Sequence, residues 1–227
     1  MAPSGRSYQI SATPAAILAH LIAIAVTTLV LVWLLHFQDG FAFKSLNKLK
    51  IFNLHPFLMI VGLIIMGGEA MMAYKTVPGT RRAQKGVHVI LHQLALLAGV
   101  LGTYVIFKFK HEDGTTKDFV TLHTWLGIIT ISAYGLQFLL SFFTFLFPEA
   151  AAPRKATILP WHVFFGMAIF LLAIGTAETG LVQKSIALKL NLKISQEGLI
   201  VNFIGLLISL FGVSVGLSVI LPRRGYY

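Results

Sequence analysis

The chain has 227 residues, of which 56% are hydrophobic and only 11% are charged, whereas an ordinary soluble domain is about 45–50% apolar and about 25% charged. This composition excludes a soluble globular, disordered or coiled-coil protein, because a soluble fold of this length could not bury so much apolar surface. The chain contains no cysteine, which excludes a disulfide framework, a thiolate metal site and a cysteine nucleophile.

In chain order, the sequence contains six apolar runs of the length, about 20 residues, that a helix needs to cross a bilayer. They lie at about 15–37, 52–73, 87–107, 119–147, 161–182 and 199–221. All 18 Lys and Arg residues fall outside these runs, and a charge at the bilayer centre would cost at least about 2.5–3.5 kcal/mol. The first run is too long for a signal peptide, and no small-residue cleavage site follows it. The sequence therefore predicts an all-α fold, a six-helix transmembrane bundle that forms one domain over residues 1–227.

Six spans place both termini on one side of the membrane, which we call side one, and the opposite side is side two. Each side receives nine Lys and Arg residues, so the positive-inside rule does not orient the chain. All six arginines fall on side one, and we expect this side to be cytoplasmic. The net charge of +10 is divided between two faces. This suits the headgroups of membrane lipid or small anionic ligands, and disfavours nucleic acid, which requires one concentrated basic face.

Histidines within the four central spans are the candidate functional residues, because an ionisable side chain inside a membrane is rare and indicates function. His55 and His123 lie near the starts of the second and fourth runs, at side two. His88 and His162 lie near the starts of the third and fifth runs, at side one. The second and third spans thus look repeated in the fourth and fifth, and the four helices offer one histidine pair near each membrane face.

Two histidines from different helices at matched depth fit the two axial ligands of a haem iron, and four helices can enclose such a disc. Zinc is an alternative, although it favours four ligands that commonly include a carboxylate or a water. His88 and His92 lie one turn apart on one helix face, but Val89 stands where the zinc-protease motif carries glutamate. An intramembrane zinc protease and a histidine-lined metal permease stay open as alternatives to a haem protein.

An ordered set of motifs surrounds these histidines. The motifs are 52–56 (FNLHP), 68–75 (GEAMMAYK), 87–88 (VH), 121–127 (TLHTWLG), 159–163 (LPWHV) and 175–177 (GTA). As a set they resemble the cytochrome b561 family of ascorbate-dependent transmembrane electron carriers, and the resemblance runs over nearly the whole chain. It implies a six-helix bundle, often a homodimer, whose four central helices hold two b-type haems.

The resemblance also implies the ligand set. His55 and His123 are expected to ligate the iron of the haem near side two, and His88 and His162 that of the haem near side one. His92 occupies a position that tolerates other residues in the family, so we expect it to hydrogen-bond or pack beside the side-one haem. His20 and His36 lie on the first run, and we interpret them as interfacial or packing residues.

Substrates are implied by the resemblance as well: ascorbate at side one, and monodehydroascorbate or a ferric chelate at side two. The side-one candidates are the cations Lys85, Arg154, Arg81 and Lys75. This basic group could instead bind anionic lipid headgroups. The side-two candidates are Lys110 and His111. The implied protein is an oxidoreductase of the ascorbate ferrireductase type in a vacuolar, vesicle or plasma membrane, and a haem subunit linked to quinone is a further alternative.

Overall fold

The computed structural model describes residues 11–114, 120–146 and 152–222, and these ranges contain helices and no strand. Six helices have the length and apolar composition needed to cross a membrane. They are Thr13–Phe37, Lys48–Thr76, Arg81–Glu112, Leu122–Leu146, Pro153–Ala187 and Gln196–Ile220. The predicted all-α fold with six helices that could span a membrane is therefore confirmed.

Several spans are composites of α-helical and wider, π-helical segments. The first comprises α1 (Thr13–Val32) and η1 (Trp33–Phe37); the second comprises α2 (Lys48–Phe57), η2 (Leu58–Ile65) and α3 (Met66–Thr76). The others are α4 (Arg81–Glu112), α5 (Leu122–Ser141) with η3 (Phe142–Leu146), α6 (Ala152–Ala187) and α7 (Gln196–Ile220). Pro56 has no amide hydrogen with which to continue the helical ladder, and the second span widens into η2 two residues later.

The helices extend past the predicted apolar runs into charged residues, most clearly in the second, third and fifth spans. The physical reason is that hydropathy marks only the hydrocarbon layer, whereas backbone hydrogen bonding continues into the polar headgroup region. Four helices begin at a residue whose side-chain oxygen accepts from a backbone amide of the first turn. These residues are Asn47 for α2, Thr80 for α4, Thr121 for α5 and Ser195 for α7. The two ends of the predicted run 119–147 lie outside the described residues.

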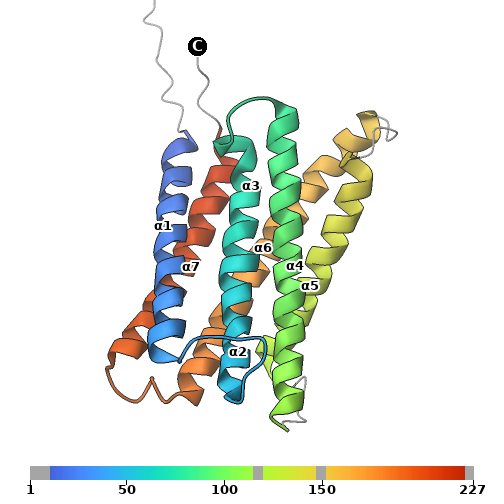
Figure 1. The fold of residues 1–227 in the computed structure, drawn as a ribbon. Helices are drawn as coiled ribbons and strands as arrows, with labels where there is room; N and C mark the ends of the chain where they lie inside the picture. Colours follow the sequence, from blue (N-terminus) through green and yellow to red (C-terminus); the bar gives the residue numbers. More distant parts are fainter. Residues whose placement is uncertain (1–10, 115–119, 147–151, 223–227) are drawn as a thin grey trace, which may run out of the picture.

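Successive spans run in opposite directions, and both ends of the described chain lie at the same end of the bundle (Figure 1). There the amide of Ala12 donates to the carbonyl of Pro222 at 2.9 Å, which joins the start of α1 to the end of α7. α1 packs on α7, and this pair packs on α3 and α6. Contacts between η2 and α4, α4 and α5, α5 and α6, and α6 and η2 close the four central spans into a ring around a common interior.

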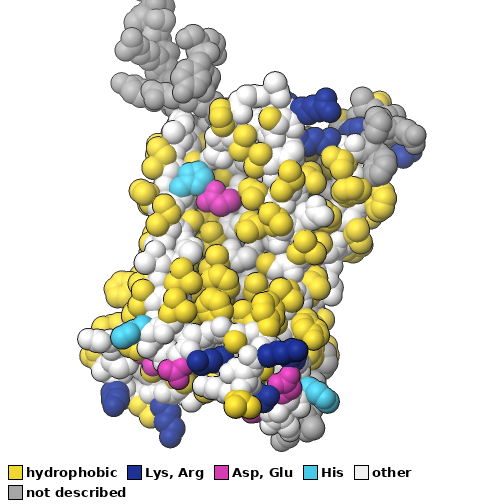
Figure 2. Space-filling view, in the orientation of Figure 1, with side chains coloured by type: hydrophobic (Ala, Val, Ile, Leu, Met, Phe, Trp, Pro, Cys, Tyr) yellow, Lys and Arg dark blue, Asp and Glu magenta, His cyan; other side chains and the backbone are white. Residues whose placement is uncertain are grey.

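The close-packed apolar core lies between α1, α7 and the central helices. Its largest buried side chains include Trp33, Ile64, Met72 and Phe211. The outer faces of the spans are apolar too, with Ile24 66% exposed as one example. These outer side chains form a hydrophobic belt, and most charged side chains in view lie at its two ends (Figure 2). Such a belt is the surface that a hydrocarbon layer of about 30 Å covers.

Gly62 marks a close approach between the second span and α4. A Cβ atom at this position would overlap the Cβ atom of Ala98 on α4. Because a methyl group on a helix backbone cannot rotate away, the two spans can pack at this distance only if residue 62 has no side chain.

We expect Gly62→Ala to destabilise the bundle by about 1–3 kcal/mol, because overpacking forces the two helices apart. Gly216→Ala on α7 is the matched control, since its Cβ would only reach Sδ of Met167 at 4.0 Å, an ordinary contact. Helix propensity favours alanine at both positions by about 1 kcal/mol. Thermal unfolding in detergent measures the effect, and an equal gain in Tm for both variants would contradict the close approach.

Candidate functional site

A pair of imidazoles from different helices lies near side two. His55 on α2 and His123 on α5 have ring centroids 6.0 Å apart and ring planes at 87°. Nδ1 of His55 lies 3.0 Å from the carbonyl oxygen of Gly102 on α4, and Nδ1 of His123 lies 2.9 Å from that of Thr176 on α6. Because a carbonyl can only accept, Nδ1 carries the proton in both rings, and Nε2 keeps a lone pair for a metal. Four helices hold this pair.

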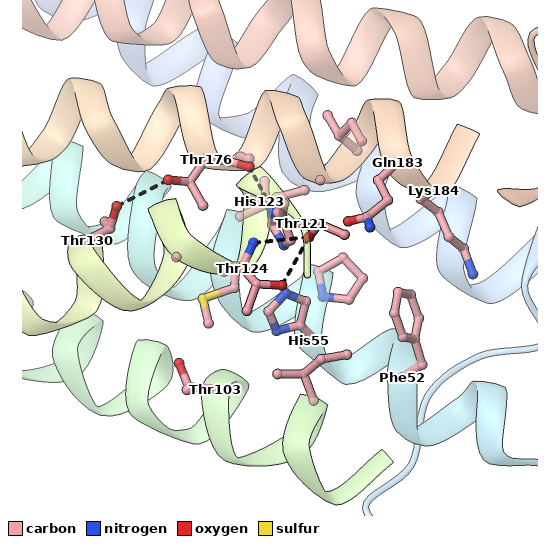
Figure 3. A pocket seen from close by; sticks show the side chains of 18 of the residues that line it. Phe52, His55, Thr103, Thr121, His123, Thr124, Thr130, Thr176, Gln183 and Lys184 are labelled. Carbon is pink, nitrogen blue, oxygen red and sulfur yellow. Dashed lines mark hydrogen bonds between the residues drawn. The ribbon is translucent and has the colours of Figure 1, made fainter. Parts of the chain in front are cut away.

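The two rings line a cavity of about 450 Å³ that the central spans enclose (Figure 3). Its walls are mainly apolar, with Met59, Leu63 and Ile131 among them. Threonines supply most of the remaining lining, and they turn their hydroxyls onto protein partners: Thr130 donates to the carbonyl of Leu126 at 2.7 Å. The cavity is therefore an apolar space with two imidazoles as its principal metal-binding groups, which suits a large apolar cofactor.

A second imidazole pair lies near side one. His88 on α4 and His162 on α6 have ring centroids 6.1 Å apart and ring planes at 74°. Nδ1 of His88 lies 2.8 Å from the carbonyl oxygen of Ala70 on α3. Nδ1 of His162 lies 2.8 Å from Oγ of Ser141 and 2.9 Å from Nε2 of Gln137, both on α5. Gln137 Nε2, also on α5, donates at 2.9 Å to the His162 carbonyl. This pair, too, is held by all four central spans.

Both pairs fit the two axial positions of a haem iron. A metal–nitrogen bond is about 2.0–2.1 Å long and the ring centre lies about 1 Å further, so two imidazoles on opposite sides of one metal have centroids about 6 Å apart. Within the part of the chain that the structure describes, no three His, Cys, Asp or Glu side chains gather to hold a metal ion. At each site, two histidines from different helices lie about 6 Å apart, and two is the number of protein ligands that bis-imidazole haem requires.

The spacing of the two sites follows from helix geometry. On α4, His88 belongs to one site and Gly102 contacts the other. On α6, His162 belongs to the first site and Thr176 contacts the second. Each interval is fourteen residues, close to four turns, so both sites meet the same face of each helix about 21 Å apart. The two sites are therefore stacked along the bundle.

Gly180 makes the position of His123 possible. A Cβ atom at Gly180 on α6 would lie 2.7 Å from Cε1 of His123 and 3.0 Å from its Nδ1. The imidazole can therefore reach the Thr176 carbonyl only because residue 180 has no side chain. Sequence reasoning missed this role. The spacing Thr176, Gly180, Lys184, with one residue per turn of α6, was the available signal.

His92 packs beside the side-one pair. Its ring centroid lies 4.5 Å from that of His88, and its Nδ1 lies 2.5 Å from the hydroxyl of Tyr134 on α5. Tyr134, Gln137 and Ser141 lie on one face of α5 at a helical spacing of three and four residues. A polar stripe of this period in an apolar span was the signal in the sequence for the partners of His92 and His162.

The predicted side-one cations have different surroundings. Lys85 donates to the carbonyl of Phe145 in η3, whose ring centroid lies 5.3 Å from that of His162. Arg81 and Arg154 are exposed in the first turns of α4 and α6. Lys75 donates at 2.7 Å to the carbonyl of Leu221 at the end of α7. Lys85 thus stands beside the His162 site, whereas Lys75 is tied to the other edge of the second span.

At side two, the structure separates the two predicted residues and adds a third. Lys110 is half-buried and lines the cavity, whereas His111, the next residue, is exposed. Lys184 on α6 also lines the cavity, and its Nζ lies 4.3 Å from the ring centroid of Phe52 (Figure 3). In the sequence, Lys184 reads only as a loop charge. The mouth of the cavity therefore carries two lysines from different helices.

Three further polar residues have partners away from the cavity. His20 does more than pack, because its Nδ1 lies 2.9 Å from Oε1 of Glu69. His36 is exposed and places its ring edge-on to Phe37, as an interfacial residue would. Asn53, two residues before His55, does not support that ligand and instead donates to the carbonyls of Gln38 and Gly40, both at 2.8 Å.

Comparison with known proteins shows the family of this chain. The profile of the family described as "Eukaryotic cytochrome b561" matches residues 54–188, a range that contains all four paired histidines. "Probable ascorbate-specific transmembrane electron transporter 1" from Oryza sativa subsp. japonica is 43% identical, with 95% of this chain and 93% of that protein aligned. "Transmembrane ascorbate ferrireductase 2" from Arabidopsis thaliana is 38% identical, with 93% of each aligned. Since the profile spans more than half of the chain and these relatives span nearly all of it, the chain belongs to the cytochrome b561 family of b-type haem proteins.

Proposed function

We propose that this protein carries electrons across a membrane, from ascorbate at side one to monodehydroascorbate or a ferric chelate at side two, with two b-type haems per chain. The observation that carries the proposal is the presence of two bis-histidine sites, stacked along one four-helix core. The names of the relatives, which specify ascorbate-specific electron transport and ascorbate ferrireduction, support the donor. A haem bound at each pair would supply a one-electron redox centre. On this proposal the protein is a transmembrane oxidoreductase.

The chain's own residues hold the ligands and keep water away. At three of the four histidines a backbone carbonyl accepts from Nδ1, which fixes the tautomer and makes Nε2 a better electron donor to a metal. At the fourth, His162, the partners of Nδ1 are side chains of α5, the hydroxyl of Ser141 and the amide of Gln137. Apolar walls around the side-two pair exclude solvent, and a dry surrounding tunes a redox centre.

We assign ascorbate binding to the side-one cations. Ascorbate is an anion at neutral pH, and a cationic surface beside a redox site concentrates and orients it. Lys85 has the best position, since its partner Phe145 contacts His162. Arg154 and Arg81 rank next because they are exposed near the same edge. Lys75 ranks last because its ammonium group is bound by the end of α7.

We assign the acceptor to the mouth of the side-two cavity. Monodehydroascorbate and many ferric chelates are anionic, which suits Lys110 in the cavity wall and His111 at the surface. Lys184 adds a second positive charge at the same mouth. With electrons moving from side one to side two, both termini face the cytoplasm in a vacuolar, vesicle or plasma membrane, and the family resemblance supports a homodimer.

Replacing one ligand should remove one haem. His55→Ala or His123→Ala should lose the side-two haem, and His88→Ala or His162→Ala the side-one haem, because each change removes one of the two imidazoles that would hold that haem. We expect two haems per wild-type chain and about one in each variant, measured as haem absorbance per protein. His92→Gln is the matched control and should keep both. One haem in the wild type would contradict the proposal, and a colourless protein would favour the metal permease.

Gly180→Ala should remove mainly the side-two haem, because the new methyl group occupies the space of the His123 ring. The side-one haem is the internal control, and Gly216→Ala is the control for glycine replacement in general. Reduced-minus-oxidised absorbance of the purified variants measures the outcome as a loss of about half the amplitude. Full retention of both haems in Gly180→Ala would show that His123 does not depend on this glycine.

Lys85→Gln and Arg154→Gln should each slow reduction by ascorbate about tenfold, because an anionic donor then meets a weaker field. Glutamine keeps a donor for the Phe145 carbonyl while it removes the charge. Lys193→Gln, exposed at side two, is the matched control. Stopped-flow haem absorbance measures the rate, and the difference from wild type should shrink at high salt.

The absorbance spectrum and reduction by dithionite should stay normal in these variants. Wild-type ascorbate rates in both Lys85→Gln and Arg154→Gln would contradict the assignment of the donor site. Sealed vesicles of known orientation test the direction: ascorbate enclosed on side one should reduce an external ferric chelate. Donation only at side two would reverse the proposed orientation.

A further inference from the structure

Lys110 on α4 and Lys184 on α6 occupy equivalent positions at the side-two end of the cavity. Each lies eight residues after the residue whose carbonyl accepts from a paired imidazole, which is Gly102 on α4 and Thr176 on α6. Eight residues of helix correspond to about 12 Å, so the two lysines stand at one level, on the side-two side of the histidines. Both lysines are half-buried, and both line the cavity.

An internal repeat relates these two lysines. An interval of 74 residues separates Lys110 from Lys184, and the same interval separates His88 from His162. The four central spans form a ring in the order η2, α4, α5 and α6, so α4 and α6 lie opposite each other. The core therefore has an approximate two-fold axis along the membrane normal, and the two lysines face each other across this axis.

Phe52 connects the lysines to the ligand pair. Nζ of Lys184 lies 4.3 Å from the ring centroid of Phe52, and that centroid lies 6.4 Å from the centroid of His55. The ring of Phe109, the neighbour of Lys110, has its centroid 5.3 Å from that of Phe52. Lys184 and Phe52 lie on the same side of the histidine pair (Figure 3). Both lysines are thus close to the space that a ligand of the two imidazoles would fill.

The charge of the cavity lining is positive only. Among the described residues that line the cavity, there are two lysines and no carboxylate. The nearby acidic side chains have other partners: Glu112 bonds Lys48 at 2.6 Å, and Glu197 accepts from the indole of Trp33 at 3.1 Å. An apolar cavity with two cations at one edge suits an apolar ligand with two carboxylates at one edge. A b-type haem is such a ligand, because its two propionates leave the same edge of the ring.

The symmetry of the lysines matches that of the cofactor. In a haem, the in-plane axis that passes between the two propionates exchanges these propionates and also exchanges the two faces of the ring. In the protein, the approximate two-fold axis exchanges Lys110 with Lys184 and exchanges the helices that carry His55 and His123. When the two axes coincide and the propionate edge faces side two, each propionate meets one lysine and each face meets one imidazole.

A purely structural role explains less of what these lysines do. Both lie in the last turn of their helix, where a positive charge interacts favourably with the free carbonyl groups. An exposed cation is sufficient for that role and needs no contact with the cavity. A half-buried ammonium group against apolar side chains loses hydration, and a carboxylate inside the cavity would compensate for that loss.

We propose that Lys110 and Lys184 bind the two propionates of the side-two haem, so that this haem lies with its propionate edge toward side two. Each ammonium group donates to one carboxylate, and the pairing neutralises charges that would otherwise enter an apolar cavity unpaired. An ammonium group has three donors, so each lysine can still attract an anionic acceptor to the mouth. This inference rests on the proposed function, which places a haem between His55 and His123.

The test measures how fast the purified full-length protein, in phosphatidylcholine nanodiscs, loses haem to excess apomyoglobin. The side-two haem is identified as the kinetic phase that is absent from His55→Ala. Lys110→Gln and Lys184→Gln should each speed this phase about tenfold, because each change leaves one carboxylate without a charged partner. Lys184→Arg keeps the charge and should lose haem at the wild-type rate. Lys193→Gln, exposed at the same membrane face, is the matched control and should do the same.

Haem dimethyl ester separates a propionate contact from a general loss of packing. Protein made in haem-deficient cells and loaded with this ester has no carboxylate for the lysines to bind, so both Gln variants should then lose it at the wild-type rate. A wild-type rate of haem loss in either Gln variant, or an equal acceleration with the ester, would overturn the inference. A wild type that holds one haem per chain would instead contradict the proposed function, and the assay uses neither ascorbate nor an acceptor.

Discussion

Hydrogen bonds from imidazole Nδ1 to a neighbouring helix orient the four central histidines, and the other features of the core depend on them. Three such bonds go to backbone carbonyls: His55 to Gly102, His88 to Ala70 and His123 to Thr176. A helix carbonyl already accepts one bond from its own helix, but its second lone pair is free to accept another. Each imidazole is thereby tied to a helix other than its own, and its orientation is as rigid as the contact between the two helices.

This dependence explains where the bundle is tightly packed and where it is open. The apolar core lies outside the central ring, where α1 and α7 cover α3 and α6 and enclose Trp33 and Phe211. Inside the ring, the side-two half holds a cavity of about 450 Å³. Contacts with α1 and α7 hold these central helices from outside, so an apolar space suited to a cofactor can remain between them. Without such outer contacts, the helices would close on the space to regain van der Waals contacts.

Close approaches set the remaining dimensions of the core. Gly62 brings the second span against Ala98 of α4, and Gly180 lets His123 lie against the backbone of α6. The fourteen-residue interval on α4 and α6 is almost four full turns, so the same helix face meets both histidine pairs. A shorter interval would bring the two sites closer together, and one that departed from whole turns would point one of them toward lipid.

The six spans, the four paired histidines and the family could all be predicted from the hydropathy and the residue types of the sequence. A bilayer imposes one length and one composition on each helix, and these are local properties of the chain. The roles of Ser141, Gly180 and Lys184 were not predicted, because they come from the rotation and register of packed helices. Lys75 likewise binds the end of α7 and does not lie beside the His162 site, and His20 contacts Glu69, which is 49 residues away along the chain. Contacts between helices depend on how ridges and grooves fit along their whole length, and no short stretch of sequence contains that information.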